Sequence, residues 1–317
     1  MSTVPRPPIA IVGPTAVGKT ELAVELCIRF GGEVINADSR QVYRSMDIGT
    51  AKPTAAEQFQ TPHHLIDLLE PSETFGLGSF LNLAKEASDD IVSRGRIPFL
   101  TGGTGQYVWA MLEGQSVPPV PPNPALREEL EREAVIEGGA QVLHDRLKAI
   151  DPARANALDA RNVRRVIRAL EIHYATGKKP SELRTSVNEQ GKFLVLGLTT
   201  ERKTLYRRID DRVDAMMKAG FLAEVERLLA SDYPSGQGAL DSPGYRELGL
   251  YLMGQLTLDE AVFRTKTQTH RLARRQYTWF KLSDPRITWL EAGTPRLPTK
   301  AAEHVIEYLS EPGSVVQ

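Results

Sequence analysis

The stretch "GPTAVGKT", residues 13–20, decides the fold of this 317-residue chain. It fits the pattern G-x-x-x-x-G-K-[ST], in which glycines let a loop wrap so that its backbone N–H groups point at an anion. The apolar run "PIAIVG" (8–13) precedes the loop, and the helical pattern "KTELAVELCIRFG" (19–31) follows it. A strand, this loop and a helix in succession predict a diphosphate-binding site at a helix N-terminus. Its predicted binding residues are Gly13, Pro14, Thr15, Ala16, Val17, Gly18, Lys19 and Thr20.

More strands of the same kind are expected further along the chain. Short apolar runs lie at 32–39, 97–103, 192–200 and 286–292, and helical patterns separate them. Strands that alternate with helices predict the α/β class, here a P-loop NTPase-like parallel sheet with helices on both faces.

The proline-rich segment 117–124 interrupts this alternation, because proline cannot continue a helix or pair within a central strand. Only charged helical patterns follow it until residue 192. We therefore predict a catalytic core formed by 1–118 and 186–317, and a helical insertion domain at 119–185.

Composition narrows the choice of compartment and partner. The net charge is −1, so an RNA would have to be held by local basic patches rather than by the whole surface. Cys27 is the single cysteine, which excludes an internal disulfide and fits a reducing compartment. The sequence has no apolar run of about 20 residues, the length that a membrane span needs. We expect a cytoplasmic protein without a signal peptide or membrane segment.

The carboxylate that usually accompanies a nucleotide-binding loop is missing from its usual place. A second strand generally ends in an Asp that supports magnesium, but "IPFLTGG" (97–103) ends in threonine and glycine. The strand-terminal carboxylate of the right kind is Asp38, in "VINADS", which could support a metal or act as a general base. Lys19 adds a point charge to the loop, and the Thr20 hydroxyl can ligate Mg²⁺. The loop alone does not indicate a nucleoside triphosphate.

Several motifs together resemble the tRNA dimethylallyltransferase family in its bacterial form. They cover nearly the whole chain in the family's order: "GPTAVGKT", "NADSRQVYRSMDIGTAKPT", "PHHLID", "GRIPFLTGGTGQYV", "GFLAEVERLL", "GYRELGLYL" and "RLARRQYTWF". Val17 and Gln106 depart from the residues usual in the family, as does "SPGYREL". These departures concern details of the substrate channel. No cysteine follows Cys27, so the zinc-binding tail of some eukaryotic members is not expected.

The resemblance implies transfer of a dimethylallyl group from dimethylallyl diphosphate to N6 of the adenine 3′-adjacent to the anticodon. The loop would then hold the leaving diphosphate with Mg²⁺ on Thr20, and Asp38 would accept the proton of the adenine amine. Two further family positions, Thr104 and Arg212, are implied to be catalytic. Thr104 also has the position of a helix N-cap. The implied partners are dimethylallyl diphosphate and the tRNA anticodon stem-loop, with a monomeric enzyme expected.

Two basic patches offer an RNA surface. The first is a stripe of arginines at i, i+3, i+4 and i+7, expected on one helix face: Arg161, Arg164, Arg165 and Arg168. The second is the segment 262–283, which holds basic residues and no acidic one. Together with the resemblance, these patches predict tRNA contacts at Asp38, Ser39, Arg40, Gln41, Thr104, Arg127, Arg161, Arg164, Arg165, Arg168, Tyr245, Arg246, Arg274, Arg275 and Lys281.

Three other functions share parts of this pattern. An adenylate prenyltransferase that makes a free cytokinin from AMP would use the same core, but it would not need the insertion or the basic patches. A P-loop small-molecule kinase would use the loop for ATP, and a nucleotide-dependent RNA-binding module would use it without catalysis. The insertion and both patches favour a tRNA substrate.

Overall fold

The computed structural model describes residues 8–118, 120–183, 193–231, 233, 236 and 238–311. These residues divide into two compact units: those that fall within 1–112 and 189–317 form one, and those that fall within 113–188 form the other. The second unit encloses the segment 119–185 that was predicted to be the insertion. Proline-rich sequence at 117–124 marks one of its ends.

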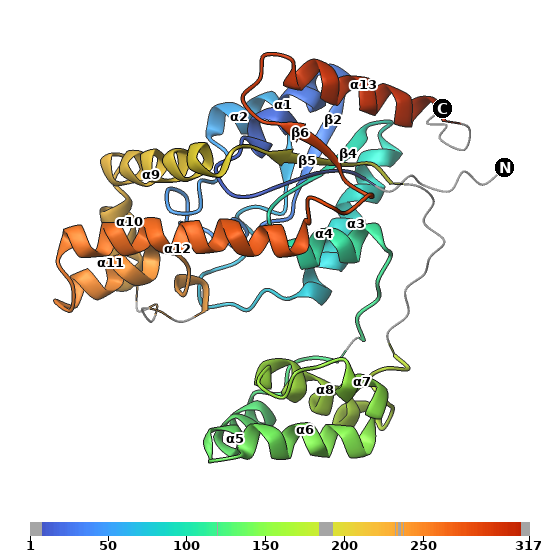
Figure 1. The fold of residues 1–317 in the computed structure, drawn as a ribbon, viewed down its shortest axis with the longest axis vertical. Coiled ribbons are helices and arrows are strands. Elements are labelled where there is room, and N and C mark those ends of the chain that lie inside the picture. The colour runs from blue at the N-terminus through green and yellow to red at the C-terminus, as the bar shows by residue number, and fades with distance from the viewer. Residues whose placement is uncertain are drawn as a thin grey trace. The chain divides into compact units, whose positions relative to one another are not determined.

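The first unit contains one six-stranded sheet in the order β3-β2-β4-β1-β5-β6 (Figure 1). Every pair of neighbouring strands is parallel, which confirms the predicted α/β fold. The strands are β1 (Ile9–Val12), β2 (Gly32–Asn36), β3 (His63–His64), β4 (Ile97–Thr101), β5 (Val195–Thr199) and β6 (Thr288–Glu291). The edge strand β3 was not predicted, because two histidines give no apolar signal.

Helices cover both faces of this sheet. In the first unit they are α1 (Lys19–Phe30), α2 (Ala55–Gln60), α3 (Leu77–Ser93), α4 (Gly105–Leu112), α9 (Arg202–Lys218), α10 (Phe221–Ala230), α11 (Tyr245–Leu252), α12 (Leu258–Trp279) and α13 (Leu297–Ser310). Between α9 and α10, Gly220 has φ 99°, a left-handed conformation that glycine adopts without strain and that ends the first helix. None of the helices that the structure describes combines the length and apolar composition needed to cross a membrane.

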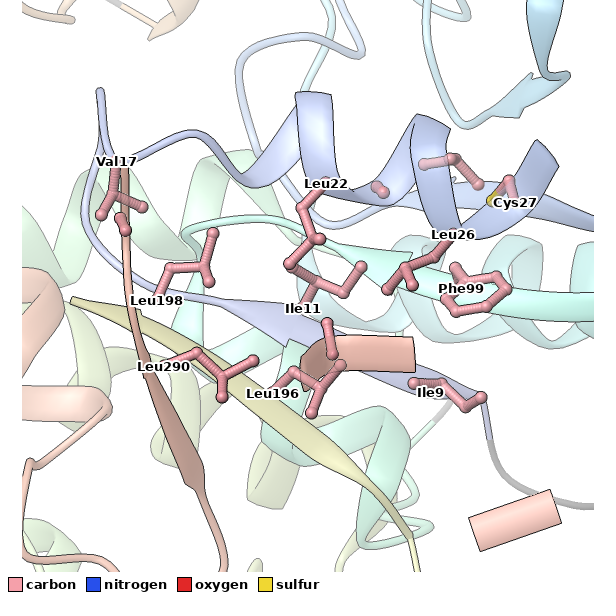
Figure 2. Close-up of a cluster of buried hydrophobic side chains, with 14 of the residues drawn as sticks. Ile9, Ile11, Val17, Leu22, Leu26, Cys27, Phe99, Leu196, Leu198 and Leu290 are labelled. Carbon is pink, nitrogen blue, oxygen red and sulfur yellow. The ribbon is translucent and has the colours of Figure 1, made fainter. Parts of the chain in front are cut away.

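The two faces of the sheet have separate cores. Ile9 and Ile11 of β1 pack with Leu22 and Leu26 of α1 on one face, as Figure 2 shows. Ala10 and Val12, which alternate with them, pack on the other face with residues of α3 and α4. Cys27 lies in the first core and is 2% exposed, so it is a small buried hydrophobe, as its place in the apolar pattern of 19–31 predicts.

The second unit is helical. It consists of α5 (Pro124–Val135), α6 (Gly139–Ile150), α7 (Pro152–Asn156) and α8 (Val163–Thr176). Leucines from three of these helices form its core: Leu130, Leu143, Leu147 and Leu170. Because these side chains are 0–2% exposed, the unit has an apolar interior of its own.

An ion network surrounds Glu33 on β2, whose side chain is only 1% exposed. Arg94 binds both of its carboxylate oxygens, Arg96 donates to Oε1 at 2.8 Å, and His64 Nε2 lies 2.6 Å from Oε2. Hydrogen bonds from Arg94, and secondarily from His64 and Arg96, outweigh burial and lower the pKa of Glu33 to about 2. A buried carboxylate with these partners stabilises the fold only while it is ionised.

We expect Glu33→Gln to lower the free energy of unfolding at neutral pH by about 3 kcal/mol, the value that corresponds to a pKa depressed from 4.5 to about 2. Because the folded-state pKa is depressed, this stabilisation is present above pH 4.5 and is lost as the pH falls towards 2. Urea denaturation across this pH range should therefore show a flatter dependence for Glu33→Gln than for the wild type. The exposed Glu25 gives the matched control, Glu25→Gln. Parallel pH profiles for the wild type and Glu33→Gln would contradict the assignment.

Candidate active site

A cavity of about 330 Å³ lies at the carboxyl ends of the central strands. Its walls include residues of the loop after β1, Asn36 and Asp38 at the end of β2, and Thr101 and Gly102 at the end of β4. Helices α9 and α12 contribute Arg212 and Gln276. Ligands of open α/β sheets bind at this end of the strands, so the cavity is the candidate active site.

The phosphate-binding loop has the conformation that its glycines predict. Gly13 has φ 143°, and a Cβ there would lie 2.5 Å from the carbonyl oxygen of Leu198. Gly18 has φ 104° and immediately precedes α1, which begins at Lys19. Both positions therefore require glycine. The loop and the N-terminus of α1 present backbone N–H groups to the cavity, an arrangement that favours an anion.

Two partly buried cations, Lys19 and Arg212, line this cavity together with the carboxylates of Asp38 and Glu57. Burial lowers the pKa of Lys19 to about 8, with Arg212 adding to the effect and the charge of Asp38 opposing it. Burial also lowers the pKa of Arg212, opposed by the charges of Asp38 and then Glu57. Lys19 Nζ donates a hydrogen bond to the carbonyl oxygen of Pro14 at 2.8 Å. A bound anion would favour the charged form of both cations.

Asp38 is held in the first turn after β2. Its Oδ1 accepts the backbone N–H of Arg40 at 2.9 Å, and its own N–H donates to Asn36 Oδ1 at 3.2 Å. Asn36 is fixed in turn by donating to the carbonyl oxygen of Leu65 at 3.2 Å. The structure thus brings Asp38 into the same cavity as Lys19, Thr20 and Arg212.

Thr104 joins the loop after β4 to the loop after β2. Its Oγ1 accepts the N–H of Ser39 at 3.2 Å, and its own N–H donates to the carbonyl oxygen of Ala37 at 3.2 Å. The hydroxyl is thus directed to Ser39, and the helix that follows begins at Gly105. These contacts position the segment that carries Asp38. The carbonyl oxygen of Thr104, which was predicted to be catalytic, also accepts the N–H groups of Tyr107 and Val108 at the start of α4.

The segment 47–51 forms another wall, and Glu224 holds it in place. Glu224 on α10 is 2% exposed and accepts the N–H groups of Asp47, Ile48 and Gly49 at 3.0, 2.8 and 3.1 Å. Gln41 Nε2 donates to the carbonyl oxygens of residues 50 and 51, both at 3.1 Å. Sequence reasoning missed Glu224, although it occupies the apolar face of α10 beside Phe221, Val225 and Leu228. The signal available in the sequence was a carboxylate on a helix face whose other residues are apolar, which indicates a buried Glu with structural partners.

Tyr245, a predicted tRNA contact, lies in the wall of the cavity and not on the outer surface. This side chain is 1% exposed, and its hydroxyl donates to Glu224 Oε1 at 2.6 Å. Its ring packs edge-on against Phe221, with centroids 5.0 Å apart. The neighbouring Arg246 is exposed and forms an ion pair with Asp241 at 3.2 Å. Tyr245 therefore supports the cavity wall rather than an external RNA surface.

The predicted stripe of four arginines needs correction. Helix α8 begins at Val163, so Arg161 precedes it, and Arg161 pairs with Asp159 instead. Arg168 binds Glu171, which is 1% exposed, and donates to the carbonyl oxygen of residue 120 at 2.8 Å. A buried carboxylate needs such compensation, and the sequence does not show that Glu171 is buried.

Arg127 has the same structural partner. It donates to both oxygens of Glu171, at 3.0 Å from Nε and 2.8 Å from Nη2. The arginines of α8 that remain exposed are Arg164 and Arg165, which lie on its outer face. Within the second unit, these two are better suited to bind phosphates than Arg127 or Arg168.

The second basic patch is exposed along α12 and just after it. Arg274, Arg275 and Lys281 are all exposed. Phe280 is fully buried, as expected of a core residue, whereas Trp279 is 41% exposed. An exposed ring among cations is a possible stacking surface for a base.

The described residues of the cavity would hold Mg²⁺ together with a bound anion rather than by protein ligands alone. Among the described residues, no group of three or more His, Cys, Asp or Glu could hold a metal. Thr20 and Asp38 do line the same cavity and offer the oxygen ligands that Mg²⁺ prefers. Mg²⁺ is commonly bound by one or two protein oxygens together with phosphate oxygens and waters.

Comparison with known proteins agrees with this geometry. A family model described as IPP transferase matches residues 41–283, and one described as Isopentenyl transferase matches residues 9–67. The chain is 49% identical over 303 residues to the tRNA dimethylallyltransferase of Roseiflexus sp. (strain RS-1), covering 96% of this chain and 99% of the relative.

Solved structures agree as well. The tRNA isopentenylpyrophosphate transferase of Bacillus halodurans has a TM-score of 0.71 and 41% identity, covering 96% of this chain and 97% of that chain. A eukaryotic dimethylallyltransferase acting on tRNA has a TM-score of 0.78 and 32% identity, covering 95% and 78%. The chain belongs to the IPP transferase family, whose curated relatives are tRNA dimethylallyltransferases.

Proposed function

We propose that this chain transfers a dimethylallyl group from dimethylallyl diphosphate to N6 of the adenine that follows the anticodon in tRNA. The observation that carries the proposal is that the phosphate-binding loop, two partly buried cations and Asp38 meet in one cavity. The names of the relatives support the same reaction. The products are N6-isopentenyladenosine and diphosphate.

Departure of the diphosphate is the step that the loop assists. As the C–O bond of the prenyl donor breaks, negative charge develops on the diphosphate oxygens. The loop N–H groups, Lys19 and Arg212 would stabilise this charge. Mg²⁺ bound with the diphosphate, held by Thr20 and supported by Asp38, would supply further charge neutralisation.

Asp38 has the chemistry to assist the adenine. Nitrogen N6 forms the new bond to carbon while the C–O bond breaks, and the amine must then lose one proton. A carboxylate within hydrogen-bonding reach orients the amine and accepts that proton. The hydrogen bond from the Arg40 N–H fixes the direction of the Asp38 carboxylate.

The acceptor is assigned from the predicted basic tRNA contacts that are exposed and have no ion pair within the described part of the chain. In the helical unit these are Arg164 and Arg165, and in the core unit they are Arg274, Arg275 and Lys281. Such exposed cations position an RNA by its phosphates, while the reacting base must leave its stack to reach a cavity. An AMP acceptor has no use for these surfaces.

One assay separates the proposal from its rivals. Labelled dimethylallyl diphosphate should transfer its label to an anticodon stem-loop that has adenine 3′ of the anticodon. Transfer to AMP alone would indicate the adenylate prenyltransferase. ATP turnover without prenyl transfer would indicate the kinase, although β4 ends at Thr101 and is followed by Gly102 rather than by a carboxylate.

Asp38→Asn should reduce kcat for prenyl transfer by about 100-fold, the usual contribution of a general base. Single-turnover assays on a stem-loop measure the rate constant of the transfer step directly, which should fall by the same factor. Asp89→Asn, at an exposed position of α3, is the control and should retain wild-type turnover. Near-normal turnover of Asp38→Asn would remove Asp38 from the role of base.

The double variant Arg164→Ala/Arg165→Ala should bind tRNA with a weaker salt dependence. Two lost phosphate contacts reduce the slope of log Kobs against log salt by about 1.5 to 2. Filter-binding titrations at several salt concentrations provide this slope. The control variant Lys85→Ala/Lys300→Ala removes two exposed lysines from the core unit and should leave the salt slope unchanged. A wild-type slope for the arginine variant would exclude these residues as phosphate contacts.

A further inference from the structure

One amide of the phosphate-binding loop differs from those that follow it. In the described part of the chain, the N–H groups of residues 16–20 have no protein acceptor, so they are available to an anion. The N–H of Thr15 instead donates to Oε1 of Gln276 at 2.8 Å. Gln276 belongs to α12, so its contact with the loop joins residues 261 positions apart.

Gln276 is held firmly in this position. It is 7% exposed, and its Nε2 donates to the carbonyl oxygen of Gly103 at 3.3 Å. A Cβ at residue 103 would lie 2.0 Å from that Nε2, so only glycine leaves room for the glutamine. The side chain is thus anchored at both of its polar atoms, which opposes its rotation out of the loop.

We propose that Gln276 limits the loop to a diphosphate by occupying the place where a further phosphate would bind. An oxygen that accepts from Thr15 must sit where Oε1 of Gln276 already is. To enter, it would have to displace a buried side chain and leave the Gly103 carbonyl without its donor. Two phosphates can use the N–H groups of residues 16–20, whereas a third is left without the Thr15 donor. This inference rests on the proposed function, since it assumes that the loop binds a diphosphate.

The test compares inorganic pyrophosphate with inorganic tripolyphosphate, which differ by one phosphate. Isothermal titration calorimetry in Mg²⁺ should show that the wild-type protein prefers pyrophosphate by about tenfold, the value of one charge-assisted hydrogen bond. Gln276→Leu and Gln276→Asn should each reduce this ratio to near one. Leucine removes both polar atoms, and asparagine keeps the amide but is too short to reach Thr15. Gln268→Leu, on the same helix, is the control and should retain the wild-type ratio.

Hydrogen exchange of the Thr15 amide gives a readout that does not depend on a ligand. The amide should exchange slowly in the wild type and at least about tenfold faster in Gln276→Asn, because its acceptor is lost. The inference alone would be overturned if the wild-type protein binds pyrophosphate and both Gln276 variants retain its preference for pyrophosphate over tripolyphosphate. A wild-type protein that binds neither anion would overturn the proposed function and the inference together.

Discussion

Lys19 and Arg212 place two positive charges in one cavity, and burial lowers the pKa of each. Burying a cation even partly is unfavourable unless an anion is near; Asp38 supplies one such charge to both cations, and Glu57 supplies another to Arg212. At the loop itself, Lys19 and the N-terminus of α1 still favour an anionic ligand. A diphosphate satisfies this requirement, and it also provides oxygens for the free N–H groups of the loop.

The parallel sheet places these groups together. Because β1, β2 and β4 run in the same direction, the loop, Asp38 and the Thr101–Gly102 turn meet at one edge. Residues from distant parts of the chain then fix the segments at that edge. Glu224 holds 47–49, Thr104 holds Ser39, and Gln276 holds Thr15. Each uses a partly buried hydrogen bond, and together these bonds stabilise the walls of the cavity.

The sequence predicted those parts of the molecule that depend on neighbours in the chain. The loop at 13–20 has a spacing imposed by its own backbone, and five of the six strands are apolar runs. The roles of Glu224 and Gln276 were not predictable, since the segments that they hold, 47–49 and the loop at Thr15, lie 175 to 177 and 261 positions away. The arginine stripe was misread for a related reason. Charge spacing shows which residues can share a face, but not that Glu171 is buried and binds two of the nearby arginines.

The central claim is that the loop holds the diphosphate of a prenyl donor beside a carboxylate base. A crystal structure with Mg²⁺ and a dimethylallyl thiolodiphosphate, which resists cleavage, tests it most directly. The account predicts both phosphates within residues 13–20 in contact with Lys19 and Arg212, and the reactive carbon on the side of the cavity that holds Asp38. A diphosphate bound away from this loop, or a prenyl carbon remote from Asp38, would contradict it.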